Sequence, residues 1–216
     1  MLEKMGDFFD ARLMGYEEHQ LNCIDSAQEF YPFTASCLPQ NPGVRLLDLG
    51  CGTGLELGYY FEMVPSAEIT GIDLAPGMLD ELHNKFPDKK MTLILGSYFD
   101  VPFDENAYDA AVSVESLHHF TKEEKKTLYR KLQTALKPEG FFILTDYFAM
   151  SDEEEQFHRA ELLRLKIEQK IADEAFYHYD TPLTVEHETE ALLEAGFSSV
   201  EVLNNWGATY TIKAIR

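Results

Sequence analysis

The chain has 216 residues, 45% of them hydrophobic, which suits one domain with a full core and a modest appendage. Its 38 acidic residues against 18 Lys and Arg give a net charge of −20, which argues against unaided binding to nucleic acid. The sequence shows no signal-peptide core and no run that could span a membrane, so we expect a cytoplasmic protein without membrane contact. Cys23, Cys37 and Cys51 have neither metal-ligand nor redox spacing, so we expect no bound metal.

The first forty residues favour helix, with one segment near Tyr16 to Phe30 and another around Thr34 to Leu38. From residue 44 strands and helices alternate regularly. The predicted strands are 44–49, 67–73, 91–95, 108–114 and 141–145, and the predicted helices between them are 54–63, 76–86 and 122–136. Thr121 and Glu124 have the spacing of a capping box for the last of these helices. Such alternation predicts a parallel sheet covered on both faces.

The pattern changes after the fifth strand. Residues 151–176 predict one long acidic helix, with Ser151 as its N-cap. Its apolar stripe consists of Phe157, Ala160, Leu163, Ile167 and Ile171. A further helix is expected over 184–195, closed by Gly196. Strands 199–203 and 208–214 finish the chain, and their short connection makes this last pair antiparallel.

A glycine-rich loop follows the first strand, with Gly50, Gly52 and Gly54 spaced G-x-G-x-G. A dinucleotide site requires its third glycine where Leu55 stands, and no Lys-Ser/Thr pair completes a phosphate-binding P-loop. The loop therefore suits close backbone approach to a ligand without phosphate. Asp73 ends the second strand, where a carboxylate can accept hydrogen bonds from both ribose hydroxyls. The alternative role is to cap the following helix, and the two roles are compatible.

These segments resemble the ordered motifs of class I S-adenosylmethionine-dependent methyltransferases over about residues 40 to 148. Residues 47–54 (LDLGCGTG) are similar to the first motif and residues 71–79 (GIDLAPGML) to the second. Later landmarks are residues 101–103, 108–112, 117–120 (LHHF) and 136–140 (LKPEG). The resemblance implies a Rossmann-like α/β fold with a seven-stranded, mainly parallel sheet, an antiparallel last strand and helices on both faces. It implies S-adenosylmethionine as cofactor and S-adenosylhomocysteine as product.

The resemblance also implies a division of the single domain into four parts. These are an N-terminal helical cap (1–40), a cofactor-binding core (41–148), a helical lid insertion (149–182) and a final helix with a β-hairpin (183–216). By position in the motifs, the implied cofactor-binding residues are Asp48, Gly50, Cys51, Gly52, Gly54, Asp73, Leu74, Met78, Ser97, Tyr98 and Glu115. Ser97 departs from the family, in which many members have an acidic residue that binds the adenine. The Ser97 hydroxyl with the Tyr98 backbone, or Asp100, is the candidate for that contact.

Residues for the acceptor are sought at the carboxyl ends of the strands and in the cap and lid. Candidates for a general base are Glu115, His118, His119, Asp146 and Tyr147, although a base is needed only for a protonated, weak nucleophile. Candidates for substrate binding are Tyr16, His118, Tyr147, Tyr177 and His178. For each of these, packing is the competing explanation.

Three functions are open at this stage. The first is methyl transfer to a small-molecule acceptor, because the net charge disfavours nucleic acid. The second is synthesis of carboxy-S-adenosylmethionine, for which the carboxylate-binding arginine cannot be located. The third is regulatory binding of S-adenosylmethionine without turnover. The sequence also leaves a homodimer open.

Overall fold

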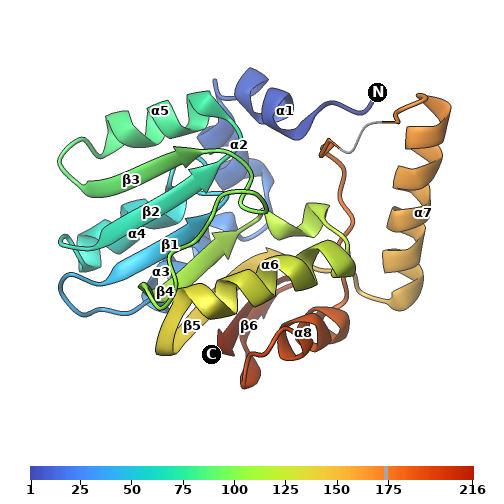
Figure 1. The fold of residues 1–216 in the computed structure, drawn as a ribbon. Coiled ribbons are helices and arrows are strands. Elements are labelled where there is room, and N and C mark those ends of the chain that lie inside the picture. The colour runs from blue at the N-terminus through green and yellow to red at the C-terminus, as the bar shows by residue number, and fades with distance from the viewer. Residues whose placement is uncertain (173–174) are drawn as a thin grey trace.

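A computed structural model describes residues 1–172 and 175–216. Seven strands form one sheet in the order β3-β2-β1-β4-β5-β7-β6 (Figure 1). Neighbours from β3 to β5 pair in parallel, and β7 alone runs the opposite way, antiparallel to both β5 and β6. The strands are β1 (Arg45–Leu49), β2 (Glu68–Asp73), β3 (Lys90–Leu95), β4 (Tyr108–Val114), β5 (Leu136–Tyr147), β6 (Ser199–Trp206) and β7 (Thr209–Ile215). This arrangement confirms the fold class expected from the sequence.

Helices cover both faces of the sheet because successive strand side chains alternate between two cores. Leu46 of β1 packs in the core formed with α3, α4 and α5, whereas Leu47 packs in the core formed with α6 and α8. The helices are α1 (Met5–Ala11), α2 (Tyr16–Cys23), α3 (Ala27–Ser36), α4 (Leu55–Met63), α5 (Pro76–Lys85), α6 (Lys122–Ala135), α7 (Asp152–Glu168) and α8 (Val185–Glu194), with a 3₁₀ turn at Leu117–His119. Among the described residues, no helix is both long and apolar enough to cross a membrane.

The predicted helix boundaries hold where the capping residues are clear. Thr121 and Glu124 form the reciprocal capping box at the start of α6. Thr184 accepts a hydrogen bond from the His187 N–H at the start of α8, and Gly196, with φ +106°, follows the end of that helix. These local signals were sufficient because they satisfy backbone groups that a helix leaves free at its ends.

Two predictions in the N-terminal cap and in the fifth strand are wrong. The expected helix from Tyr16 to Phe30 is two helices, separated where Ser26 adopts a left-handed φ of +61°, and the second continues through Pro32 to Ser36. β5 begins at Leu136, immediately after α6, and not at residue 141. The residues expected to form a turn before this strand, 137–140, lie within β5 as an irregular segment. Glu139 has φ +66° there, and the register with β4 shifts.

The long acidic helix is also shorter than predicted. α7 ends at Glu168, near Lys170 with its φ of +54°, and residues 173–174 of the predicted helix lie outside the described residues. Three members of its apolar stripe are 61–68% exposed, so the stripe is not a packed face. Polar contacts attach the helix instead, because the buried Glu155 accepts hydrogen bonds from Thr184 N and His187 Nδ1.

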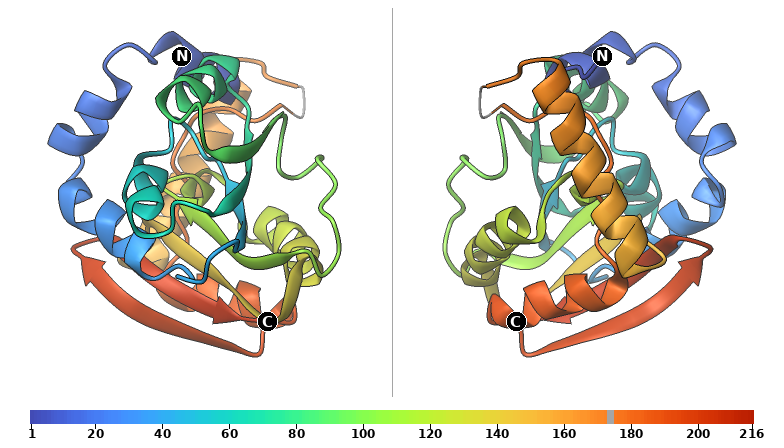
Figure 2. Two further views of the ribbon diagram at one scale, coloured as in Figure 1. Left: turned by 90° about the vertical axis from the view of Figure 1, so that its left-hand side faces the viewer. Right: turned by 90° about the vertical axis from the view of Figure 1, so that its right-hand side faces the viewer.

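The N-terminal segment and the segment after α7 meet beyond the carboxyl ends of the parallel strands. Met5 N donates to Phe176 O, His178 N donates to Glu3 O, and Lys4 forms an antiparallel bridge with Tyr177. Figure 2 shows α2 and α3 along one flank of the molecule, and α7 across the side on which the strands end. Both segments therefore lie over the carboxyl ends of the strands, where open α/β sheets bind ligands.

Candidate functional site

The glycine loop has a backbone that only glycine adopts readily. Gly50, Gly52 and Gly54 have φ values of +76°, +47° and +71° between β1 and α4. Gly50 N and Cys51 N donate to Ile72 O, at 2.9 and 3.2 Å, which ties the loop to β2. A Cβ on Gly50 would overlap the Ser116 side chain. The first two glycines line a cavity, whereas Gly54 precedes α4 and the Cys51 side chain is buried against Gly71.

Asp73 is held by the backbone on both sides. Its Oδ2 accepts a hydrogen bond from Gly52 N at 2.9 Å, and its Oδ1 accepts one from Ala75 N at 2.8 Å. The N-cap of α5 is Ala75, so Asp73 is not the helix cap. Each carboxylate oxygen still has a free lone pair, and Asp73 lines the same cavity as Leu74 and Met78. The carboxylate is thus fixed in one orientation and can accept further hydrogen bonds from a ligand.

Asp48 lies beneath this loop and is 1% exposed. Neither carboxylate oxygen has a hydrogen-bond partner among the described side chains and backbone. Burial, followed by the neighbouring Glu56 carboxylate, raises the pKa of Asp48 well above its usual value. A buried acceptor without a donor is uncommon in folded proteins. Asp48 lines neither cavity, and a cationic group brought to the loop would lower this pKa by stabilising the charged carboxylate.

Glu115 follows β4 directly and has a left-handed φ of +49°. Its Oε1 is buried without a hydrogen-bond partner among the described residues. Burial raises the pKa of Glu115 to about 8, although the charge of His118 opposes the shift. A carboxyl group in this state takes up and releases a proton near neutral pH.

The 3₁₀ turn carries two histidines whose pKa values are shifted in opposite directions. His118 Nδ1 lies 2.5 Å from Asp146 Oδ1. Burial lowers the pKa of His118, but Asp146 more than compensates and raises it to about 9. Burial lowers the pKa of His119 to about 4. Asp180 lies beside both rings, its Oδ1 being 3.6 Å from His118 Nε2 and 3.2 Å from His119 Nδ1.

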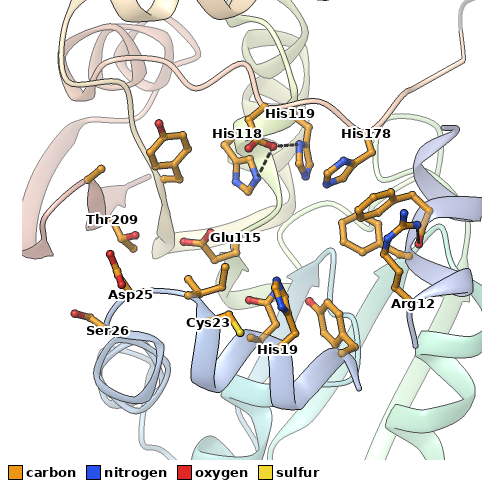
Figure 3. A pocket seen from close by; sticks show the side chains of 18 of the residues that line it. Arg12, His19, Cys23, Asp25, Ser26, Glu115, His118, His119, His178 and Thr209 are labelled. Carbon is orange, nitrogen blue, oxygen red and sulfur yellow. Dashed lines mark hydrogen bonds and ion pairs between the residues drawn. The ribbon is translucent and has the colours of Figure 1, made fainter. Parts of the chain in front are cut away.

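Two adjoining cavities meet at these groups. The larger, of about 1130 Å³, lies between the cap, the end of the sheet and the segment after α7 (Figure 3). The smaller, of about 50 Å³, lies over the glycine loop and Asp73. Phe9, Tyr16, Glu115 and His119 line both cavities.

Residues of α1 help to enclose the smaller cavity. Typical ligand pockets measure about 300–1000 Å³, and Met5 and Phe9 of α1 fill the space above Asp73. Asp10 Oδ1 accepts a hydrogen bond from Gly77 N at 2.8 Å, which fastens α1 to α5. The smaller cavity is thus below the size of a typical ligand pocket, and α1 is one of the elements that enclose it.

The structure brings most of the predicted substrate residues to the larger cavity. Tyr16, His118, Tyr147 and His178 line it, and Asp146 lies behind His118. Tyr177 does not line it and pairs with Lys4 instead. These assignments concern position, and their roles in binding stay predictions.

Of the residues discussed for the adenine contact near Gly96, only Tyr98 lines the smaller cavity. The Tyr98 hydroxyl lies 3.2 Å from Ser116 Oγ. Ser97 does not line it, because its Oγ accepts a hydrogen bond from Phe99 N within the loop. Asp100 is exposed and lines neither cavity.

Several lining residues were not singled out as site residues from the sequence. Phe8, Phe9 and Met5 come from a helix whose faces could not be assigned to a partner, and Trp206 comes from the final hairpin. Asp180 closely follows two predicted substrate residues, Tyr177 and His178, but was not itself a candidate. Its pairing with two histidines about sixty residues earlier depends on how the segment after α7 returns to the sheet.

Comparisons with known proteins agree with this geometry. Residues 46–140 match the model of a methyltransferase domain family. The chain is 32% identical over 135 residues to the biotin biosynthesis bifunctional protein BioHC of Teredinibacter turnerae, covering 58% of this chain and 23% of that protein. It is 28% identical over 123 residues to the uncharacterized methyltransferase sll0829 of Synechocystis, covering 57% and 56%. The chain thus spans less than a quarter of the first relative's length and just over half of the second's.

Solved structures share the fold. An S-adenosylmethionine-dependent methyltransferase from Mesorhizobium loti superposes with a TM-score of 0.63 at 20% identity, covering 86% of this chain and 96% of that one. Human N-acetylserotonin methyltransferase, solved in complex with SAM, superposes with a TM-score of 0.63 at 16% identity, covering 88% and 52%.

Proposed function

Because the chain carries a class I methyltransferase domain whose cofactor is S-adenosylmethionine, we propose that it methylates a small-molecule acceptor held in the larger cavity. The observation that carries this proposal is the shared wall of the two cavities. Phe9, Tyr16, Glu115 and His119 border both, so two ligands would meet there with their reacting ends adjacent. Transfer between two bound molecules gains most of its rate from such positioning.

The residues around the smaller cavity fit the cofactor. Asp73 would accept from the ribose hydroxyls, Leu74 and Met78 would pack on the adenine, and the backbone at Gly50 and Gly52 leaves room for close approach. Asp48 has two buried acceptor oxygens without a partner among the described residues, and the ammonium group of the methionine part would lower the raised pKa of this carboxyl by stabilising its charged form. The bound cofactor supplies a methyl group already activated on a sulfonium.

Glu115 is the residue that we assign as general base. It borders both cavities, and its Oε1 has no competing hydrogen-bond partner among the described residues. The acceptor O–H or N–H would give its proton to this carboxylate as the acceptor atom gains the methyl group. Tyr147 and Trp206 wall the cavity beyond, which helps to exclude water from the reacting atoms.

The cavity favours a small acceptor over a macromolecule. Its volume of about 1130 Å³ exceeds that of a typical ligand pocket and is enough for a whole small molecule. The net charge of −20 would repel a nucleic acid. Aromatic and histidine side chains form a large part of its lining, which suits an acceptor with a flat or apolar body and one polar end.

The test combines turnover with binding. Purified protein is incubated with S-adenosylmethionine and a panel of small hydroxy, amino and carboxylic compounds, and release of S-adenosylhomocysteine is measured. Glu115→Gln is expected to lower kcat by about 10²- to 10⁴-fold, the usual contribution of a general base. Its Kd for S-adenosylmethionine should change little. The exposed Glu190→Gln on α8 is the matched control, because it removes the same charge far from either cavity.

Three outcomes would contradict parts of this proposal. No binding of S-adenosylmethionine at micromolar concentrations would refute the assignment of the cofactor site. Tight binding without turnover on every acceptor would favour a non-catalytic role. A Glu115→Gln enzyme with the kcat of the unmodified protein would show that Glu115 is not the base.

A further inference from the structure

We propose that the larger cavity contains a binding site for one divalent transition-metal ion, ligated by His118 Nε2, His119 Nδ1 and Asp180 Oδ1. The existence of this site does not depend on the proposed function, although its use in catalysis would. Figure 3 shows both imidazoles at one wall of the cavity, with dashed lines marking their contacts to a carboxylate between them.

The spacing of the three donor atoms matches a metal site. All lie within 4.8 Å of one another, and the carboxylate oxygen is 3.2 Å from one imidazole nitrogen and 3.6 Å from the other. Ligands at about 2.0–2.1 Å from a zinc ion at tetrahedral angles are separated by about 3.4 Å. The two separations from Asp180 Oδ1 are therefore close to those of ligands that share one ion, and the ion would displace the proton that His118 holds at neutral pH.

A carboxylate behind His118 orients this ligand, as in known metal sites. Asp146 Oδ1 lies 2.5 Å from His118 Nδ1, which directs the other ring nitrogen, Nε2, toward the cavity. Asp146 is itself fixed, because its Oδ2 accepts from Leu117 N at 2.8 Å. A carboxylate on the second nitrogen of a ligating histidine is the usual arrangement.

The backbone holds both halves of the site together. His118 and His119 occupy one 3₁₀ turn, with ring centroids 4.0 Å apart. Thr181 N donates to His118 O at 2.7 Å, which anchors the residue after Asp180 to the same turn. The ligands are thus pre-organised although about sixty residues separate them, and pre-organisation lowers the cost of binding.

The donor set indicates the class of metal. Two imidazoles and one carboxylate suit Zn²⁺, Fe²⁺, Co²⁺ or Ni²⁺, whereas Mg²⁺ and Ca²⁺ prefer oxygen ligands. Three protein ligands leave at least one position open. Because the site lines the cavity, that position would face an acceptor oxygen or nitrogen. Glu115 lies near His118 and could take the proton from an acceptor bound there.

The competing explanation is an ion network in which Asp180 simply bridges two imidazoles. Metal binding to the full-length protein distinguishes the two. Protein dialysed against a chelator is titrated with ZnCl₂ by calorimetry, and with CoCl₂ while the visible absorption of bound cobalt is recorded. The proposal expects one ion per chain and a cobalt spectrum of low coordination number.

Variants locate the ion. Asp180→Asn and His119→Ala each should weaken Zn²⁺ binding by at least about 100-fold. Asp146→Asn should weaken it by about 10- to 100-fold, because the carboxylate that orients the His118 ring is lost. His83→Ala is the control, because it removes an exposed histidine of α5 and should leave the affinity unchanged. Circular dichroism and thermal unfolding verify that each variant is folded.

The results separate this proposal from the proposed function. Failure of the unmodified protein to bind either metal, or equal affinity in the unmodified protein, Asp180→Asn and His119→Ala, would overturn the metal site. Metal binding that these variants abolish would uphold it even if no acceptor is ever methylated. S-adenosylmethionine affinity, measured on the same metal-free samples, reports on the cofactor site independently.

Discussion

Replacement of Asp73 by alanine tests the cofactor site most directly. The carboxylate is held by Gly52 N and Ala75 N, so its free lone pairs point to a fixed place in the smaller cavity. Loss of hydrogen bonds to two ribose hydroxyls costs about 1–3 kcal/mol each, or about 2–6 kcal/mol together. This predicts a Kd for S-adenosylmethionine that is weaker by about 30-fold to about 10⁴-fold.

The same change also removes two intramolecular hydrogen bonds. Their loss should lower the free energy of unfolding by about 1–3 kcal/mol, so stability must be measured beside affinity. Calorimetric titration with S-adenosylmethionine and urea unfolding provide the two numbers. Asp73→Asn, which keeps one acceptor oxygen, should fall between the alanine variant and the unmodified protein. An unchanged Kd in a folded Asp73→Ala protein would refute the ribose assignment.

Three further predictions concern stability. Gly50→Ala should lower the free energy of unfolding by clearly more than Gly43→Ala in urea titrations; both have φ above +70°, but only at Gly50 would the new Cβ overlap a side chain. Lys125→Met should cost about 3–5 kcal/mol by the same measurement, because it leaves the buried Glu188 without its ion pair, and adding Glu188→Gln should restore part of the loss. Burial raises the pKa of Asp109, but hydrogen bonds from the Arg45 backbone and from Lys137 lower it below its usual value. The contribution of Asp109 to the free energy of unfolding is therefore complete above its unfolded pKa of about 3.9, and it disappears as the pH falls through the lower folded pKa. Asp109→Asn should therefore flatten the acid side of the unfolding curve, and an unaltered curve would contradict this.

The sheet could be predicted because its signals are local. The alternation of strands and helices predicted a sheet covered on both faces, and Leu46 and Leu47 of β1 indeed pack in opposite cores. The capping box at Thr121 defined the start of α6. The positions of Gly50 and Asp73 followed from the rule that parallel strands bind ligands at their carboxyl ends.

The remainder depends on long-range contacts that periodicity does not record. The apolar stripe of α7 indicated a packed helix, but the buried Glu155 attaches that helix by hydrogen bonds and leaves Leu163 exposed. Likewise, the pattern around His118 gave no sign of Asp180, because the segment that carries this carboxylate has neither helical nor strand periodicity.

The position of α1 has a kinetic consequence. Phe9 of α1 borders both cavities, so an outward movement of α1 would widen both of them. One displacement thus opens the route for donor, acceptor and both products. When such a motion is slower than methyl transfer, it sets the turnover number. Acceptors of very different nucleophilicity would then share nearly the same kcat, and the Asp10–Gly77 contact that fastens α1 would act as a control on the rate of the whole cycle.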